Sequence, residues 1–372
     1  MKRLFMCLTA MLMTFLIVDT SYAKVEALQN AQDFLLKRAV MSQDGAFILI
    51  GAKGQVMETY PYAMSIKYNG ELQWEVQPSG AIKDNLYYDV AMTQEGDCLA
   101  LRYAGAESYL SVLDILSNGQ IVGEIQGLRN AYLVFPAQDG FILSCKDHFS
   151  HWRLERRNIK GDLLWKYELE EPIVLNGIVR QGDNYIAFGG KQKDREGPPK
   201  SVLFMLDDVG NLLWRYDGEA DEIFLSALDT GDGGIVLAGN TDPSSLASDT
   251  STERIRVFIT RFDENELVYR TDYAFEDGGL PQDGYLQSII ESDEGYLIAA
   301  KQQQQRFELT FILFNKQGQY LRSWNESTEP LYNPLYVSLL KKGNEIFMVA
   351  NGRDSDDLKK HITIIKSIYI ND

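Results

Sequence analysis

A short pattern recurs along almost the whole chain. Its clearest copy is "LDDVGNLLW", in which apolar residues flank a turn that ends at Gly210, and Trp214 follows that glycine by four positions. A tryptophan or tyrosine stands at the same place in four of the six copies. The turn residues lie 42 to 55 positions apart, at Gly70, Gly119, Gly161, Gly210, Asn265 and Gly318. Repetition at this spacing indicates one structural unit that is used many times.

A second pattern alternates with the first, and "GDGGIVLAG", residues 231–239, is typical of its seven copies. Asp-Gly and Asn-Gly steps supply the positive φ of a tight hairpin, and the apolar runs around them have the length and composition of strands. Helical periodicity is nearly absent. Two hairpins in each unit make four strands. We therefore predict an all-β fold, a β-propeller of four-stranded antiparallel blades. Seven blades fit best, with six or eight as alternatives because weakly patterned blades are easily miscounted.

The last unit of the chain is one strand short. It supplies three strand-like segments and then the sequence ends at Asp372. The segment 24–31 precedes the first strand of the first blade and has no blade of its own. We predict that it adds the outer strand to the seventh blade. This pairing of N- and C-terminal strands would close the ring and remove an open sheet edge.

The first 23 residues are typical of a secretory signal peptide. Lys2 and Arg3 precede an apolar run from Leu4 to Val18, and the segment ends in Ser21-Tyr22-Ala23. A membrane anchor is the alternative, but the run is shorter than the roughly 20 residues that a spanning helix needs. We therefore expect a signal peptide at 1–23 and a single propeller domain at 24–372. The protein is then exported, to the periplasm, the cell surface or the medium, and has no membrane span after cleavage.

The chain is strongly acidic. Its formal charge is −17, and loss of residues 1–23, which carry two positive charges and one negative, makes it −18. Nucleic acids and anionic membranes demand basic surfaces, so both are disfavoured as partners. Proteins and glycans remain as the expected partners. The acidity is compatible with cation binding, although it is explained equally well by the solubility of an exported protein.

The two patterns together also suggest a family resemblance. A D-G-G-[FY] turn and apolar strand, followed by D-x-x-G and a tryptophan, resembles the repeat of exported bacterial β-propeller proteins. It is distantly similar to the tryptophan-docked blades of quinoprotein-type and outer-membrane-assembly propellers. The resemblance covers nearly all of residues 32–370. It implies the propeller fold and leaves the function open, because such propellers include scaffolds, binding proteins and enzymes. Gly123 and Arg322 depart from the aromatic rule and put the packing of blades two and six in doubt.

Hairpin turns within the units are short and should share one face of the disc, whereas the long connections should emerge on the other. Long loops on a rigid scaffold are the usual site of function. We predict them at 52–61, 103–108, 146–153, 190–201, 240–254, 274–285, 301–306, 326–333 and 351–360. Aromatic residues in or beside these loops suit sugar rings or peptide side chains. The candidate binding residues are Tyr60, Tyr62, Tyr103, Phe149, Trp152, Tyr285 and Tyr332.

The segment "CKDHFSHW" is the one local cluster of metal-binding residue types. Cys145, His148 and His151 are suited to zinc or copper, but no second pair completes four ligands, so an incidental surface turn is the favoured interpretation. The acidic segment 229–234 lacks the glutamate that closes a calcium loop. We therefore predict no cofactor and keep a divalent metal as the alternative. Cys98 and Cys145 both lie in apolar strands, which favours two buried free thiols over a disulfide.

Every repeated residue has a structural role in these patterns, and no catalytic constellation is left over. The sequence therefore favours a non-catalytic exported binding or assembly module that holds a protein or glycan on its long-loop face. An extracellular carbohydrate-active or quinoprotein-like propeller enzyme is the alternative. The two differ at the central channel, where an enzyme needs converging carboxylates, arginines or a metal.

Overall fold

The computed structural model describes 26–27, 33–55, 58–80, 85–104, 110–147, 151–192, 199–241, 255–277, 280–282, 284–302, 308–358 and 360–370. These residues form seven four-stranded antiparallel sheets and one small hairpin. The predicted signal peptide at 1–23 lies outside the described residues. The described residues contain no helix long and apolar enough to cross a membrane.

Each sheet is one blade. In blades 1 to 6 the strands follow one another in chain order from the inside outward, whereas the outermost strand of blade 7 comes from the start of the chain. Blade 1 has β2 (Phe34–Met41), β3 (Phe47–Gln55), β4 (Glu58–Ile66) and β5 (Leu72–Val76). Blade 2 has β6 (Tyr87–Met92), β7 (Cys98–Tyr103), β8 (Leu110–Ser117) and β9 (Gln120–Arg129). Blade 3 has β10 (Ala131–Ala137), β11 (Gly140–Lys146), β12 (Trp152–Asn158) and β13 (Leu163–Glu168). Blade 4 has β14 (Ile173–Gln181), β15 (Asn184–Gln192), β16 (Pro199–Leu206) and β17 (Leu212–Ala220).

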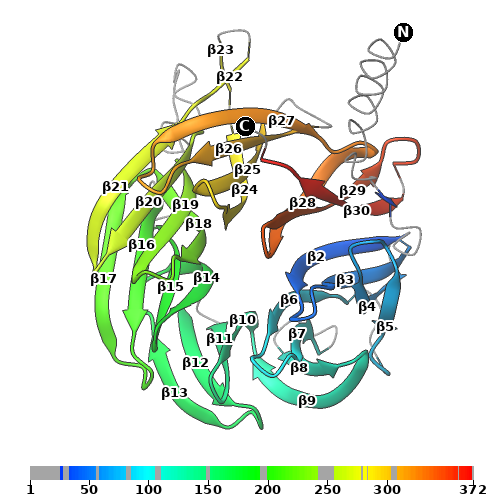
Figure 1. Cartoon of the computed structure of the whole chain (residues 1–372). Helices are drawn as coiled ribbons and strands as arrows, with labels where there is room; N and C mark the ends of the chain where they lie inside the picture. Colours follow the sequence, from blue (N-terminus) through cyan, green and yellow to red (C-terminus); the bar gives the residue numbers. More distant parts are fainter. Residues whose placement is uncertain are drawn as a thin grey trace, which may run out of the picture.

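The second half of the ring repeats this order. Blade 5 has β18 (Glu222–Asp229), β19 (Gly234–Thr241), β20 (Val257–Asp263) and β21 (Glu266–Tyr273). A hairpin of β22 (Phe275–Asp277) and β23 (Leu280–Gln282) follows and projects from the ring (Figure 1). Blade 6 has β24 (Gly284–Glu291), β25 (Tyr296–Gln302), β26 (Glu308–Phe314) and β27 (Tyr320–Ser327). Blade 7 has β28 (Leu331–Lys342), β29 (Glu345–Asp354), β30 (His361–Ile368) and β1 (Glu26–Ala27).

The ring closes through blade 7, as the sequence predicts. Strand β1 pairs antiparallel with β30, with Glu26 opposite Ile365 and Ala27 opposite Ile364. Figure 1 shows the blades around a central axis, with the inner strands of blades 7 and 1, β28 and β2, side by side. The outer strand of the last blade therefore comes from the start of the chain. The predicted all-β, seven-bladed propeller is confirmed.

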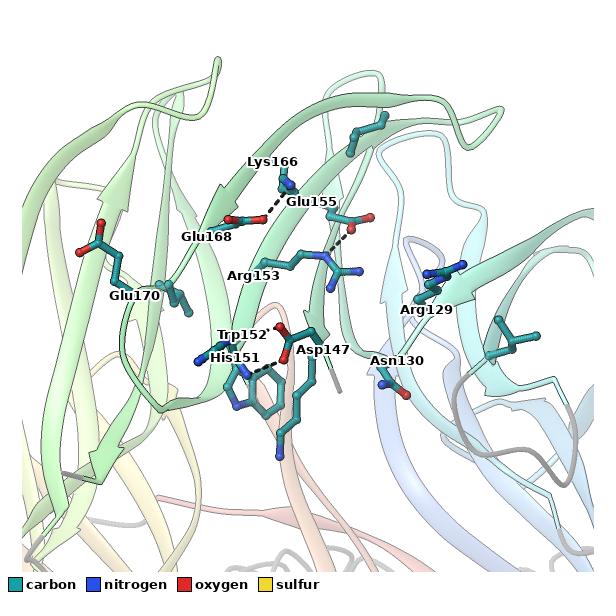
Figure 2. Close-up of a pocket in the computed structure, with 14 residues that line it drawn as sticks. Arg129, Asn130, Asp147, His151, Trp152, Arg153, Glu155, Lys166, Glu168 and Glu170 are labelled. Atoms are coloured by element: carbon teal, nitrogen blue, oxygen red, sulfur yellow. Dashed lines mark hydrogen bonds and ion pairs between the residues drawn. The ribbon is translucent and has the colours of Figure 1, made fainter. Parts of the chain in front are cut away.

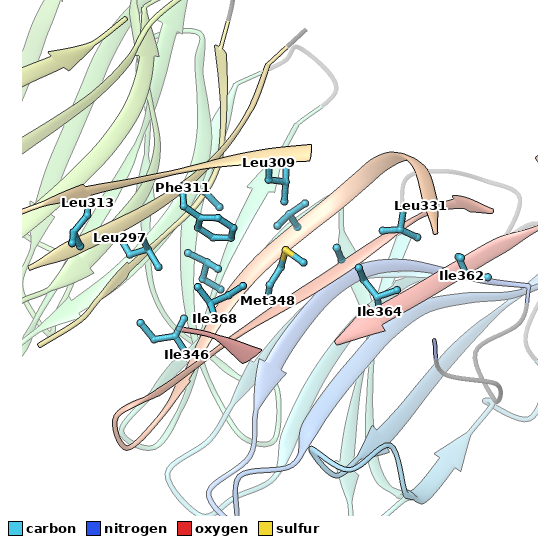
Figure 3. Packing of buried hydrophobic residues seen from close by; sticks show 14 residues of the cluster. Leu297, Leu309, Phe311, Leu313, Leu331, Ile346, Met348, Ile362, Ile364 and Ile368 are labelled. Carbon is cyan, nitrogen blue, oxygen red and sulfur yellow. The ribbon is translucent and has the colours of Figure 1, made fainter. Parts of the chain in front are cut away.

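The hydrophobic core lies between the blades. Seven buried clusters each combine residues of two adjacent blades, one cluster for every interface of the ring. In β11, for example, Phe141 and Leu143 belong to the interface with blade 2, whereas Ile142 belongs to the interface with blade 4. Both faces of such a strand are buried, which explains its continuous apolar run. Figure 3 shows the interface of blades 6 and 7, where Leu309 and Phe311 meet Met348 and Ile364.

The recurring aromatic residue packs on the turn glycine of the next blade. A side chain at Gly119 would come within 2.5 Å of Cβ of Trp74. The same relationship joins Gly210 to Trp165 and Gly318 to Tyr269. Each of these glycines also has a positive φ. The turn glycine is therefore needed twice, for the backbone conformation and for close approach of the aromatic ring.

The two blades that break the aromatic rule use the residue two positions further along. Trp324 replaces Arg322 in blade 6, stacks on Phe311 and packs against the core shared with blade 7. In blade 2, Ile125 takes this place, since its Cγ2 lies 2.7 Å from where a side chain at Gly161 would start. At this point of the interface between blades 2 and 3, Ile125 therefore fills the place that a larger aromatic side chain has in other blades.

Some of the predicted long loops are wrong. The segment 52–61 is mostly strand, because β3 runs to Gln55 and β4 starts at Glu58. The segment 274–285 contains the β22–β23 hairpin. Both segments are shorter as loops than expected because the chain stays extended and pairs with itself on both sides of each turn. Cys98 and Cys145 are buried free thiols, as predicted, and burial raises the pKa of both, that of Cys145 to about 12.

Candidate functional site

A cavity of about 610 Å³ lies between blades 2 and 3 on the long-loop face. We call it the interblade cleft. Blade 2 contributes Leu110 at the start of β8 and Arg129 at the end of β9, while the connection between the blades contributes Asn130. Blade 3 contributes residues from the β11–β12 loop and from the two outer strands, namely Lys146, Asp147, His151, Trp152, Arg153, Glu155, Leu163, Lys166, Glu168, Leu169 and Glu170 (Figure 2).

The walls of the cleft carry mostly polar and charged side chains, with Leu110 and Leu163 as the exposed apolar residues. On blade 2, Gly123 stands where other blades have an aromatic residue, and a side chain at Gly127 would meet no atom within 4 Å. On β12 of blade 3, Arg153, Glu155 and Arg157 alternate with residues that face blade 4, so the period of a strand turns three charged side chains toward blade 2. The side chains that this strand turns toward blade 2 are therefore charged, and space that solvent or a ligand can fill remains between the two blades.

Main-chain hydrogen bonds fix the loops that frame the cleft. Asn130 has a φ of 46°, a conformation that asparagine tolerates, and its carbonyl accepts the Lys146 N–H at 2.9 Å. In the β11–β12 loop, the His151 N–H donates to Oδ1 of Asp147 at 2.8 Å, and the Asp147 N–H donates to the His151 carbonyl at 2.9 Å. The Leu169 N–H donates to the Trp152 carbonyl at 3.0 Å. The site is therefore held by the scaffold.

The charged groups of blade 3 are only partly neutralised by one another. Glu155 accepts from Nε of Arg153 at 2.6 Å and from Nη2 of Arg157 at 2.6 Å. Burial would raise the pKa of Glu155, but the two guanidinium groups outweigh it and lower that pKa. Lys166 forms an ion pair with Glu168 at 2.7 Å, which lowers the pKa of Glu168. One carboxylate, that of Glu155, is thus shared by two arginines.

Two guanidinium groups face the open space. Figure 2 shows Arg153 reaching from β12 across the cleft toward the side on which Arg129 lies. Arg153 uses only its Nε, and Arg129 forms no ion pair or hydrogen bond with any described residue. The pKa of Arg153 is raised: burial opposes the charge, but the hydrogen bond to Glu155 outweighs it. Both guanidinium groups therefore have donors to spare.

Two of the candidate residues from the sequence line this cleft. Trp152 forms part of its base, 7% exposed, with Tyr132 at 5.1 Å between ring centroids and the Lys146 ammonium 5.7 Å from its ring. His151 lies at its mouth, with Nδ1 3.3 Å from Asp147. Because the indole is buried beside these two groups, Trp152 offers no open stacking platform.

The other aromatic candidates are spread over several blades. Tyr62 is buried in blade 1 and donates to Glu75, while Tyr60 lies half-buried on the same strand. Tyr103 stacks on Tyr88 at 4.5 Å. Tyr285 of blade 6 is 37% exposed, and Tyr332 of blade 7 is half-buried. They do not form one surface patch.

The proposed metal ligands are separated by burial. Cys145 belongs to the apolar core between blades 2 and 3, whereas His151 is exposed on the loop above it. His148 and Phe149 lie outside the described residues. Within the described ranges, no group of three or more His, Cys, Asp or Glu residues is arranged to hold a metal. The absence of a cofactor stays a prediction, with a divalent metal in this loop as the alternative.

The central channel is a second cavity, of about 460 Å³, lined by the inner strands. Arg38 of β2 forms an ion pair with Asp89 of β6 at 3.2 Å, and Asp89 also accepts the Val134 N–H of blade 3 at 2.7 Å. The Tyr336 hydroxyl of blade 7 accepts the Ala39 N–H at 2.9 Å. These polar groups of the channel therefore join neighbouring blades to one another.

No family model and no curated protein matches the chain. Solved structures do. The chain is similar to the β-propeller domain of the trilobed protease from Pyrococcus furiosus, with a TM-score of 0.56, 9% identity and coverage of 91% of this chain and 98% of that one. Prolyl oligopeptidase B from Galerina marginata has a TM-score of 0.54 and 11% identity over 88% of this chain and 50% of that one. A subtype N11 neuraminidase-like protein of influenza A from a flat-faced bat has a TM-score of 0.47, 10% identity and coverage of 75% and 86%.

At these identities the likeness shows the fold alone. The chain is a seven-bladed β-propeller. The fold is shared by a domain of a protease and by a prolyl oligopeptidase, and this likeness does not decide the function, which has to be argued from the interblade cleft and the channel.

Arg129, Arg153, Lys166 and Glu168 were not among the residues singled out from the sequence. Two signals point to them in retrospect. Gly123 interrupts the aromatic rule at one blade, and charged residues alternate at 153, 155 and 157 in a strand that would otherwise pack against that blade.

Proposed function

We propose that the protein is an exported, non-catalytic binding module that holds its ligand in the interblade cleft. The observation that carries this proposal is the cleft itself, a cavity of about 610 Å³ on the long-loop face with charged side chains on a rigid β scaffold. Its volume lies within the range of small-molecule and oligosaccharide sites. Its lining combines donors, acceptors and two exposed leucines, Leu110 and Leu163.

The channel supports binding over catalysis. An enzyme that works at the propeller axis needs unengaged groups that converge on a substrate. Here Asp89 is occupied by Arg38 and by a main-chain amide, and Tyr336 accepts a main-chain amide of the next blade. These contacts give the polar groups of the channel a structural role.

The test compares two leucine variants in a thermal-shift screen of neutral glycans, acidic glycans, zinc, calcium and a quinone cofactor. Leu110→Trp places a bulky ring at the cleft, where Leu110 is 40% exposed. Leu321→Trp is the matched control, since Leu321 is 45% exposed on the outer strand of blade 6. A ligand that binds only the folded state raises the melting temperature. At one hundred times its Kd, it adds about 2.7 kcal/mol to the unfolding free energy.

We expect a ligand that stabilises the wild type and the Leu321→Trp variant but not the Leu110→Trp variant. Equal stabilisation of both variants would place the ligand elsewhere and contradict the proposal. Mass spectrometry of the incubated ligand tests whether the protein is catalytic. A chemically changed ligand would favour the carbohydrate-active or quinoprotein-like alternative.

A further inference from the structure

We infer that the ligand of the interblade cleft is a carboxylated sugar, whose carboxylate is held between Arg129 and Arg153. This inference rests on the proposed function and adds the chemical class of the ligand. It begins with the charges of the site. In a chain of net charge −17, four basic residues line one cavity together with four acidic ones, and two of the basic residues, Arg129 and Arg153, face each other from the two blades.

The two arginines have the donors that a carboxylate requires. Only Nε of Arg153 is used, by Glu155, so both of its terminal nitrogens are available. Arg129 has no hydrogen bond or ion pair with the described residues, and all its donors are available. The guanidinium group binds carboxylates with two parallel hydrogen bonds, and these are stronger than neutral ones. A carboxylate between the two walls would connect blade 2 to blade 3.

The carboxylates of the cleft restrict the ligand further. Glu168 and Glu170 lie on the same wall as Lys166, and Asp147 lies at the mouth beside His151. A ligand with many negative charges, such as an acidic peptide, would be repelled by these groups. A sugar that carries one carboxylate on each unit keeps its negative charges apart and surrounds them with hydroxyl groups, which donate to the carboxylates of the cleft.

Neutral sugars are disfavoured for a different reason. They are usually recognised by stacking on an open aromatic face together with hydrogen bonds. Trp152 is the aromatic residue in the lining, and Tyr132 and Lys146 cover it. Recognition in this cleft therefore has to come mainly from charge and hydrogen bonding, which a uronic acid unit satisfies.

The experiment measures binding to the full chain by isothermal titration calorimetry. The probes are the dimers of galacturonic, glucuronic and mannuronic acid, each with its neutral counterpart of the same linkage, and a peptide of six glutamates. The variants are Arg129→Gln and Arg153→Gln. In the second variant, Glu155 keeps its ion pair with Arg157. Arg256→Gln is the control, because it removes the same charge from an exposed position in blade 5.

We expect at least one uronic acid dimer to bind, and its neutral counterpart to bind at least tenfold more weakly. Arg129→Gln and Arg153→Gln should each weaken the acidic dimer at least tenfold, and Arg256→Gln less than twofold. The affinity should fall as the salt concentration rises. The inference is overturned if neutral and acidic dimers bind equally, if the glutamate peptide binds through these arginines while no uronate does, or if no uronate binds.

The failure of this inference and the failure of the proposed function give different results. One outcome is a neutral glycan that binds to the wild type and to both arginine variants but not to Leu110→Trp. That result would support the proposed binding module and refute only the inference of a carboxylated ligand. If no ligand depends on the cleft for its binding, both the proposed function and the inference of a carboxylated ligand are refuted.

Discussion

The indole N–H of Trp165 donates a hydrogen bond to the main-chain carbonyl of Asp208 at 2.9 Å, although the two residues lie 43 positions apart on adjacent blades. The same ring covers the turn glycine Gly210, where a side chain would come within 2.7 Å of Cδ2. One recurring residue thus supplies both packing and a polar contact at the blade interface. This relationship explains why the aromatic and the turn glycine recur together in the sequence.

Substitution of this glycine should destabilise the protein more than the same change elsewhere. Gly210→Ala forces an alanine into a φ of 88° and into contact with Trp165, so we expect a loss of more than about 1 kcal/mol of unfolding free energy. Gly343→Ala is the control, with a φ of 58° but no atom within 4 Å. Urea unfolding measures both. Equal losses would mean that backbone strain, and not the aromatic contact, explains the glycine.

A buried ion pair in blade 2 should be among the most sensitive sites. Asp114 is fully buried, accepts from Nε and Nη2 of Arg102 at 2.7 and 3.2 Å, and accepts the Tyr87 hydroxyl at 2.5 Å. Asp114→Asn leaves Arg102 with the partly exposed Glu124, at 2.9 Å, as its remaining carboxylate partner, and we expect it to cost about 3 kcal/mol.

The control for this ion pair is Asp183→Asn. Asp183 is 94% exposed and 3.5 Å from Arg180, so its loss should change the unfolding free energy by less than about 0.5 kcal/mol. Similar effects for the two substitutions would contradict the structural role that we assign to Asp114.

His361 should make stability depend on pH near neutrality. Burial lowers its pKa, the positive charge of Arg353 adds to this effect, and its buried Nδ1 has no hydrogen-bond partner among the described residues. The unfolded chain, with a pKa of 6.5, binds the proton first. The unfolding free energy of the wild type should therefore fall relative to His361→Gln as the pH drops from 7.5 through 6.5, and level off below the folded pKa. If the difference in unfolding free energy between the wild type and His361→Gln does not vary with pH, the prediction for His361 is wrong.

The N-terminal strand should stabilise the whole ring. Glu26 and Ala27 supply the outer strand of blade 7. A variant that lacks 24–31 exposes the edge of β30, so we expect its melting temperature to fall by several degrees and its unfolding to stay a single transition. An unchanged melting temperature would mean that the pairing of Glu26 with Ile365 contributes nothing to closure.

The fold could be predicted from the sequence because its signals are local and repeated. Turn glycines such as Gly210, with the aromatic four positions on, mark the outer hairpin of a blade independently of the rest of the chain. The missing strand of blade 7 could also be predicted, since a ring has no other place for segment 24–31. Loop lengths were predicted less well, because long hairpins such as β3–β4 extend beyond the apolar run that signals them.

The site could be predicted only in part. Trp152 and His151 were singled out because of their residue types, and both line the cleft. Arg129 and Arg153 were not, because an arginine on a strand has no local signal for what it faces. Their meeting depends on how blades 2 and 3 pack, and on the small residue Gly123 in a place where a tryptophan is usual.

A crystal structure of the protein with the uronic acid dimer that binds best would test the central claim most directly. We predict the sugar in the interblade cleft, with its carboxylate within hydrogen-bond distance of the guanidinium groups of both Arg129 and Arg153. A sugar bound in the central channel near Arg38 and Asp89, or in the cleft with its carboxylate turned away from the arginines, would contradict the account.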